Sequence, residues 1–204
     1  MDLIHYVAMG VGMAVAVGPF NIELINRGIK GGISPALSLA FGGIAAYISF
    51  LILIYFGLSQ SMQNQLIEIL SYTAGALILL LLGCISLTSG FGNPKASPSN
   101  QSSFVTGFFL VFASPINFMT WYSTFSQASN TLFVENSLFA ILGYCFFVIA
   151  GCFLWMINLI LTVYFIRERI SARYTKMVTL ITGIMLLWFC SEYFRRLAEI
   201  TLNW

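Results

Sequence analysis

Four long stretches without a charged residue limit how this chain can fold more than any other feature. They are residues 31–67, 69–94, 96–134 and 136–166. Each is longer than the roughly 20 residues that a helix needs to cross about 30 Å of hydrocarbon. Charged residues make up only 8% of the chain, against about 25% in an average soluble domain, and 59% of the residues are hydrophobic. The sequence therefore predicts an all-α integral membrane protein.

Turn residues and charges divide the chain into six expected transmembrane helices. They cover about residues 3–24, 35–58, 66–87, 104–125, 138–165 and 177–194. We expect the first helix to be retained rather than cleaved as a signal peptide, because no Lys or Arg precedes Arg27. The sixth helix has a short uncharged core, so Lys176 and Arg195 would extend toward the two membrane surfaces.

A single transmembrane domain, residues 1–204, is expected to consist of two halves. Residues 90–103 are rich in Gly, Ser, Asn and Pro and have the composition of a linker. They separate a first repeat of about residues 1–89 from a second of about residues 104–204. Each half would cross the membrane three times, so the two halves must face in opposite directions. This is the inverted-repeat arrangement of secondary transporters.

Two short motifs, in corresponding helices of the two halves, share a proline followed two positions later by an asparagine. They are Gly18-Pro19-Phe20-Asn21 in the first expected helix and Ser114-Pro115-Ile116-Asn117 in the fourth. Proline removes a backbone donor and clashes with the preceding turn, so each helix should break there. The carbonyl groups that a break frees must line protein or a wet cavity, because hydrocarbon cannot satisfy them.

We expect the two breaks to form a substrate-binding site near the middle of the membrane. Its candidate residues are Gly18, Pro19, Asn21, Ser114, Pro115 and Asn117. The asparagine side chains each carry a donor and an acceptor, which suits either a polar ligand or the unwound backbone. The alternative is that both prolines make simple kinks and that the asparagines form interhelical contacts worth about 1 kcal/mol each.

Glu23 is the acidic residue closest to these motifs. It is the candidate for carrying a proton or binding a substrate ammonium group, because ionisable groups at membrane depth cost about 2.5–3.5 kcal/mol and tend to be functional. The alternative is an ordinary helical ion pair with Arg27, four residues further along, at the cytoplasmic end of the helix.

The basic residues predict an orientation in the membrane. If the loops alternate between the two faces, one face holds Arg27, Lys30, Lys95, Arg167, Arg169, Arg173 and Lys176, and the other holds Arg195 and Arg196. Cytoplasmic loops are enriched in Lys and Arg, so the first face should be cytoplasmic and both termini extracytoplasmic. In a bacterium the protein would lie in the inner, cytoplasmic membrane.

Four segments carry a resemblance to a known family. They are Gly18-Pro19-Phe20-Asn21, the basic and glycine-rich residues 26–32, Gly42, and residues 107–118. Together they resemble the Gly-Pro-x-Asn signature, the first loop, a second-helix glycine and the Asn-Pro-Lys region of the LysE/RhtB amino-acid exporters. The resemblance extends over most of the chain. It implies a secondary transporter that exports a small amino acid or related amine and is driven by the proton motive force.

Two positions depart from that family's pattern. Ser114-Pro115-Ile116 stands where the family has Asn-Pro-Lys, and Tyr47 stands where it often has an Asp. Both lost groups are ionisable, so we expect this chain to handle a different solute or to couple transport differently.

Other classes of function find less support in the sequence. The only histidine is His5, so a His-Glu-x-x-His metalloprotease is excluded, and no Gly-x-Ser-x-Gly motif or nucleotide-binding loop is present. We expect no enzyme activity, no cofactor and no bound metal. A net charge of +2 gives no support for nucleic-acid binding. The expected partners are a small-molecule substrate and membrane lipid, and a homodimer is a candidate assembly for such a small carrier.

Two alternatives remain open. A transmembrane thiol carrier would use cysteines, and Cys84 and Cys190 occupy comparable places in the two halves. The default expectation is four reduced, buried cysteines that act as small apolar residues. A membrane scaffold or assembly protein would point the two motif asparagines at neighbouring helices and leave no wet cavity at the breaks.

Overall fold

Helices make up all of the regular structure in the part of the chain that the computed structural model describes. This part consists of residues 3–15, 18–56, 65–91, 99–132, 138–167 and 172–202. The helices are α1 (Leu3–Val15), α2 (Pro19–Gly31), α3 (Ile33–Tyr55), α4 (Gln65–Phe91), α5 (Asn100–Phe112), α6 (Pro115–Leu132), α7 (Leu138–Arg167) and α8 (Ala172–Leu202). The expected all-α class is confirmed. The central part of the expected linker, residues 92–98, lies outside the described residues.

Both proline motifs coincide with a break between two short helices. Pro19 is the first residue of α2, and Pro115 is the first residue of α6. Helices α1 and α2 are bent by 81° relative to each other, and α5 and α6 by 69°. Proline is well tolerated at the first position of a helix, because the N–H group that it lacks would have no helical partner there. Each motif therefore starts a new helix instead of kinking a continuous one.

The segment expected as a basic first loop, residues 26–32, is instead mostly helical. Helix α2 continues to Gly31 and is capped by Gly32, whose φ of 80° lies in the left-handed region that glycine adopts most readily. The chain turns there into α3. The expectation that Arg27 is a charged loop residue is therefore wrong, because Arg27 is a buried residue of α2. At the other end of the chain, α8 extends beyond both ends of the expected sixth span.

Two helices are individually long and apolar enough to cross a membrane. They are α3 and the segment Ala140–Arg167 of α7, and the number rises to four if each bent pair forms one span. Helix α4 contains a shorter apolar segment, Tyr72–Thr88. Large apolar side chains such as Phe56, Phe146 and Phe165 are exposed, as expected for contact with lipid. These helices agree with an integral membrane protein, and the number of six membrane spans stays a prediction.

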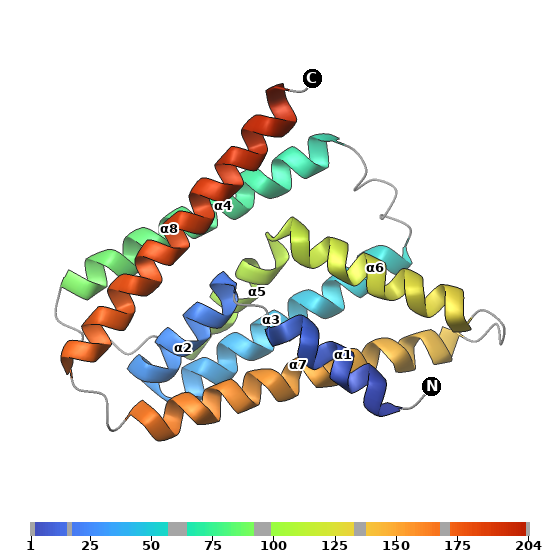
Figure 1. Cartoon of the computed structure of the whole chain (residues 1–204), viewed down its shortest axis with the longest axis horizontal. Helices are drawn as coiled ribbons and strands as arrows, with labels where there is room; N and C mark the ends of the chain where they lie inside the picture. The colour runs from blue at the N-terminus through green and yellow to red at the C-terminus, as the bar shows by residue number, and fades with distance from the viewer. Residues whose placement is uncertain are drawn as a thin grey trace.

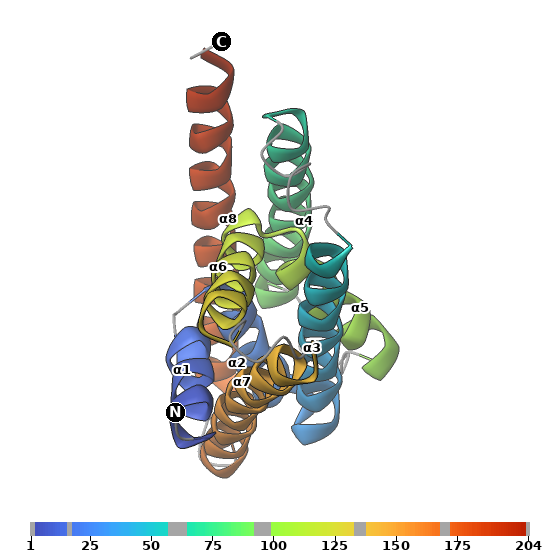
Figure 2. The ribbon, with the colours of Figure 1, turned by 90° about the vertical axis from the view of Figure 1, so that its right-hand side faces the viewer.

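The long and the short helices occupy different places in the molecule. Helix α4 lies along α8 on one side, α3 and α7 lie on the other, and the shorter α2 and α6 lie between them (Figure 1). Figure 2 shows the same arrangement after a 90° turn, with α5 against α3 and α1 against α7. Segments that are far apart in the sequence are therefore packed together throughout the molecule.

Glycines allow close contacts between helices. A Cβ atom at Gly42 of α3 would overlap the carbonyl oxygen of Phe104 in α5, and one at Gly107 of α5 would overlap the backbone of α3. Gly10 of α1 and Gly151 of α7 have the same relation to each other's helices. Small residues let two backbones approach in this way, which is how helices commonly associate within membranes.

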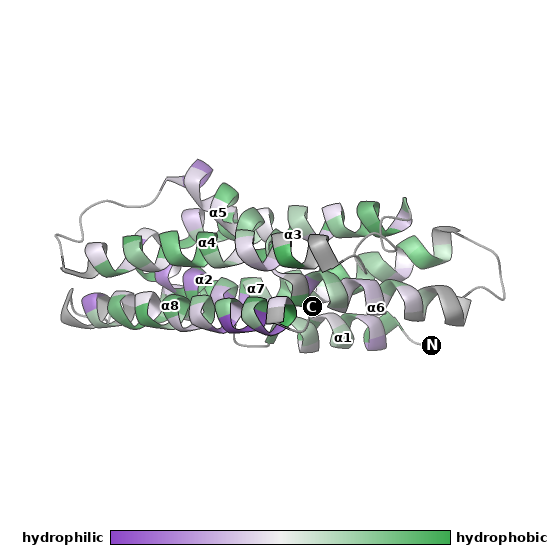
Figure 3. Cartoon of the chain, turned by 90° about the horizontal axis from the view of Figure 1, so that it is seen from above, coloured by the Kyte–Doolittle hydropathy of each residue, from purple (hydrophilic) through white to green (hydrophobic). Residues whose placement is uncertain are grey.

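Charged side chains gather at the C-terminal end of α8, which Figure 3 colours as hydrophilic, whereas α3 and α4 are largely apolar. In this region Arg195 pairs with Glu192, and Arg196 pairs with Glu199 at 3.2 Å. These pairs are exposed. Because charged groups are unfavourable in hydrocarbon, the last turns of α8 belong in water or among lipid headgroups.

Candidate functional site

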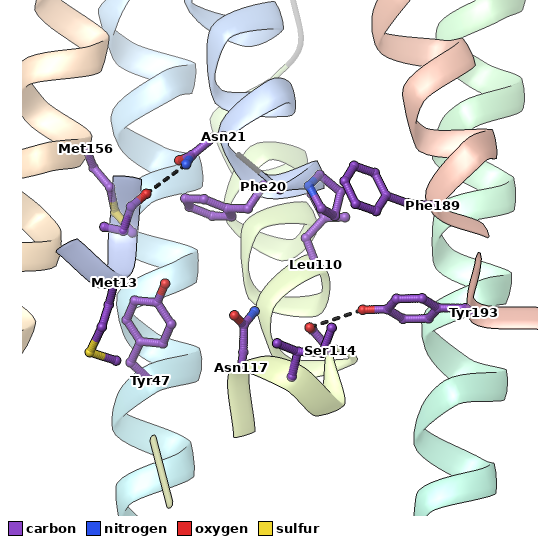
Figure 4. Close-up of a pocket in the computed structure, with 14 residues that line it drawn as sticks. Met13, Phe20, Asn21, Tyr47, Leu110, Ser114, Asn117, Met156, Phe189 and Tyr193 are labelled. Carbon is purple, nitrogen blue, oxygen red and sulfur yellow. Dashed lines mark hydrogen bonds between the residues drawn. The ribbon is translucent and has the colours of Figure 1, made fainter. Parts of the chain in front are cut away.

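The two helix breaks meet at one cavity of about 230 Å³ (Figure 4). The expected site residues that line it are Gly18, Pro19, Asn21, Ser114 and Asn117. The side chain of the sixth, Pro115, lies outside the part of the chain that the structure describes. The two motifs come from opposite halves of the chain, so packing between the halves brings them together.

Residues that the sequence analysis did not assign to the site complete the cavity wall. They are Met13, Ala14, Phe20, Tyr47, Leu110, Ile116, Met156, Phe189 and Tyr193. Phe20 and Ile116 could have been found, because each lies inside a motif. The residues from α7 and α8 could not, because these helices carry apolar side chains on several faces and the sequence does not show which face is turned inward.

Each motif asparagine bonds to the helix that precedes its break. The Asn21 amide nitrogen donates to the Ala14 carbonyl oxygen at 2.8 Å, and that of Asn117 donates to the Val111 carbonyl oxygen at 3.3 Å. Both acceptors lie in the last turn of their helix, where carbonyl groups run out of helical N–H partners. The asparagines thus stabilise the two breaks in the same way while their side chains reach the cavity (Figure 4).

Gly18 and Ser114 hold equivalent positions just before α2 and α6. The Gly18 carbonyl oxygen accepts the Ile22 N–H at 3.2 Å, and that of Ser114 accepts the Phe118 N–H at 3.3 Å. The Ser114 hydroxyl also accepts a hydrogen bond from the Tyr193 hydroxyl of α8 at 3.1 Å. Helices α2 and α6 therefore both begin at the cavity, and the positive ends of their helix dipoles lie next to it.

Tyr47 and Ile116, the two departures from the LysE/RhtB pattern, both line the cavity. Tyr47 is 8% exposed, and its ring packs against Trp121 at a centroid distance of 5.0 Å. Its hydroxyl is directed toward the Asn21 side of the cavity (Figure 4) and has no hydrogen bond to any described residue. No described lining residue carries a charge. The cavity offers a ligand hydroxyl, amide and backbone groups as polar partners.

Glu23, the expected proton or ammonium carrier, is not among the residues that line this cavity. Its carboxylate pairs with the Arg27 guanidinium at 2.8 Å, and the two residues are only 6% and 7% exposed. Arg27 also donates to the hydroxyls of Ser103, at 2.6 Å, and Thr106, at 3.1 Å, both in α5. The ion pair that was the alternative interpretation of Glu23 is present, and it is buried between helices.

Asn26 extends this cluster toward α4 and α8. Its amide nitrogen lies 3.3 Å from the Glu23 carboxylate and 3.5 Å from the Ser86 hydroxyl, and its amide oxygen accepts from Thr179 at 3.3 Å. We call the set Glu23, Asn26, Arg27, Ser86, Ser103, Thr106 and Thr179 the α2 polar cluster. It connects α2 with α4, α5 and α8, within about two helical turns of the cavity.

The four cysteines are free, and none of them lines the cavity. The thiols of Cys152 and Cys190 donate to the carbonyl oxygens of Gly10 and Ala76, each at 3.3 Å. Cys190 therefore bonds to the α4 backbone and not to Cys84. Cys84 is exposed, so the expectation of four buried cysteines is wrong for this residue. Among the described residues, no group of three His, Cys, Asp or Glu side chains could hold a metal ion.

Comparison with known proteins assigns the chain to a family. The LysE type translocator family matches residues 11–195. The chain is also similar to "Putative amino acid efflux protein YcgF" of Bacillus subtilis (strain 168), with 23% identity over 191 residues that cover 91% of each chain. No solved structure shows a significant match. The family resemblance of the sequence is thereby confirmed, and this chain belongs to the LysE type translocators, which are membrane transporters and not enzymes.

Proposed function

We propose that this protein is a secondary transporter that exports a small amino acid or related amine across the cytoplasmic membrane, and that the solute binds in the cavity between the two helix breaks. The observation that carries this proposal is the convergence of the two Pro-x-Asn motifs on a single cavity. The name of the Bacillus relative, an amino acid efflux protein, points to the same class of solute.

The helix ends around the cavity suit a zwitterion. Helices α2 and α6 begin there, and the positive ends of their dipoles attract a carboxylate. Helices α1 and α5 end beside the same breaks, and their terminal carbonyl groups attract an ammonium group. An amino acid could therefore have both of its backbone charges stabilised without a charged side chain in the cavity.

Reciprocal contacts support two inverted repeats of three spans in one domain, about residues 1–89 and 104–204. Helix α1 packs on α7 as α5 packs on α3. Between α4 and α8, a Cβ atom at Gly83 would approach the Leu187 side chain at 2.8 Å, and one at Gly183 would approach the Leu87 side chain at 2.8 Å. Exchanging the halves leaves these contacts unchanged, as a two-fold relation between repeats requires.

The positions of the helix ends support a cytoplasmic face that carries most of the basic residues. The last turn of α2 contains Lys30, the last turn of α7 contains Arg167, and the beginning of α8 contains Lys176. These helix ends lie together on the left in Figure 1, away from the two termini. We place this end in the cytoplasm and both termini outside it. Lys95 and Arg169 lie outside the described residues.

The proton motive force is the proposed energy source, with Glu23 as the candidate for the coupled proton. Protonation would remove the negative charge that holds Arg27 in the α2 polar cluster, so the connection between α2 and α5 would weaken. Helix α2 also lines the cavity, so proton and substrate would act on the same element. Glu23→Gln should therefore retain solute exchange but lose accumulation driven by an imposed proton gradient.

Counterflow in proteoliposomes tests the site. Vesicles that contain purified protein are loaded with one unlabelled amino acid and receive a trace of the same amino acid in labelled form. Exchange of at least one amino acid is expected for the wild type, and Asn21→Ala and Asn117→Ala should each reduce it at least tenfold, because both side chains line the cavity.

Asn158→Ala is the matched control, because Asn158 is an exposed asparagine of α7. This variant should exchange the solute as fast as the wild type. Absence of exchange for every amino acid would contradict the proposed function. Full exchange by both folded motif variants would leave a transporter whose binding site lies elsewhere.

A further inference from the structure

We propose that the cavity selects amino acids with a small, uncharged and apolar side chain, and that the Tyr47 hydroxyl is a substrate-binding group that hydrogen-bonds the bound solute. The inference rests on the proposed function, because it names the class of solute that the same cavity accepts.

The charges around the cavity determine the first part of this selectivity. The polar side chains of its described lining are Asn21, Tyr47, Ser114, Asn117 and Tyr193, none of which is charged. Helix ends can meet the two backbone charges of an amino acid. A third charge on the solute's side chain would be buried without a partner, which is strongly unfavourable. Lysine, arginine, aspartate and glutamate should therefore be excluded.

The size and the remaining lining of the cavity determine the second part. Its other side chains include Met13, Phe20, Leu110, Ile116, Met156 and Phe189. Its volume of about 230 Å³ lies below the roughly 300–1,000 Å³ of pockets for drug-sized ligands. An aliphatic side chain of the size of valine or leucine would leave water for this apolar wall, which the hydrophobic effect favours.

Tyr47 offers the solute a polar group that the protein itself does not use. Its hydroxyl has no hydrogen bond to any described residue, whereas the Tyr193 hydroxyl already donates to Ser114. The hydroxyl faces the cavity, so a ligand or water there can supply the hydrogen-bond partner that the protein does not. The ring packs on Trp121, which is 1% exposed, so the hydroxyl is held in a defined position. The Tyr47 hydroxyl is therefore held in place and available to bind a ligand.

Counterflow with leucine, valine, lysine and aspartate as the labelled solute in turn tests the selectivity. Leucine and valine should exchange, and lysine and aspartate should not. Exchange of lysine at the rate of leucine would overturn the inferred selectivity while the exporter function stood. Absence of exchange for all amino acids would overturn the proposed function and this inference with it.

Tyr47→Phe removes only the hydroxyl oxygen and tests its role. The variant should bind leucine about tenfold more weakly, as expected for the loss of one ordinary hydrogen bond. Its melting temperature without solute should stay close to that of the wild type, because the hydroxyl loses no described protein partner. The rise of Tm with leucine concentration, for purified protein in detergent, measures binding independently of transport.

Tyr55→Phe is the matched control, because Tyr55 is an exposed tyrosine of the same helix. It should bind leucine as tightly as the wild type does. Unchanged leucine affinity in Tyr47→Phe would overturn the proposed role of Tyr47. A tenfold loss of affinity in both variants would overturn it too, because the loss would then not depend on a residue of the cavity.

Discussion

The asparagines of the two motifs show how single residues serve both the fold and the site. Their amide nitrogens hold the last turns of α1 and α5, and their side chains line the cavity. The α2 polar cluster differs from them, because none of its members is among the described residues that line the cavity. Arg27 instead connects α2 with α5, and Asn26 connects α2 with α4 and α8. Asn21 and Asn117 thus belong to the cavity, whereas Arg27 belongs to the packing around it.

The buried ion pair leads to a prediction about stability. Arg27→Met should lower the free energy of unfolding by about 3–5 kcal/mol, because the Glu23 carboxylate would remain buried without its partner. The double variant Glu23→Gln, Arg27→Met should lose less, since it removes both charges. Denaturant titration of the purified protein in micelles measures each variant.

Arg195→Met provides the control for this prediction. Arg195 pairs with Glu192 on an exposed part of α8, where water already screens the charges, so its removal should leave stability almost unchanged. A single Arg27→Met variant as stable as the Arg195→Met variant would contradict the prediction.

At the scale of helices, contacts through glycine set how closely the elements pack. Gly42 and Gly107 bring α3 and α5 together, and Gly10 and Gly151 do the same for α1 and α7. Each pair joins a long helix to a short helix that ends at a break. These contacts therefore fix where α1 and α5 end beside the cavity. The positive φ of Gly32 plays a different part, since it permits the turn from α2 to α3.

Gly42→Ala tests the α3–α5 contact. The added Cβ atom would overlap the Phe104 carbonyl oxygen, so the helices must separate, at a cost of about 1–3 kcal/mol. Gly143→Ala in α7 is the control, because its Cβ atom would meet no atom within 4 Å. That variant should be neutral or slightly stabilising, since alanine is the better helix former. Equal melting temperatures for the two variants would argue against a close α3–α5 contact.

At the scale of the whole molecule, two of the short helices, α2 and α6, lie between the long ones. The α4–α8 pair and the α3–α7 side flank α2 and α6, so the two breaks lie in the interior (Figure 1). Irregular backbone within a membrane is tolerated where it is buried in protein or lines a cavity, and this arrangement meets that condition.

The proposed orientation predicts the location of both termini. A phosphatase reporter, which is active only outside the cytoplasm, should be active when fused after residue 204. It should be inactive when fused within the segment that follows α7, because that segment joins the helix ends that carry Arg167 and Lys176. The opposite pattern would reverse the orientation, and activity at both positions would contradict six spans.

A structural feature of this protein could be predicted from its sequence where the residues that cause it are neighbours in the chain. Charge-free stretches indicated membrane helices, and the prolines at 19 and 115 indicated the breaks, because hydropathy and the missing N–H group act through neighbouring residues. The prediction of a loop at residues 26–32 was wrong because the cause there is not local. Its glycines and charges are typical of a loop, but the bonds of Arg27 to Ser103 and Thr106 come from a distant part of the chain.

The sequence by itself determined the membrane class, the positions of both helix breaks and, through its motifs, the translocator family. Only the tertiary structure decided that the breaks share one cavity, that Tyr47 and Tyr193 line it, and that Glu23 and Arg27 are buried beside it. The physical reason is the distance along the chain between the partners. Packing of α4 on α8, α3 on α5 and α1 on α7 brings them together, and no local pattern encodes which faces of those helices meet.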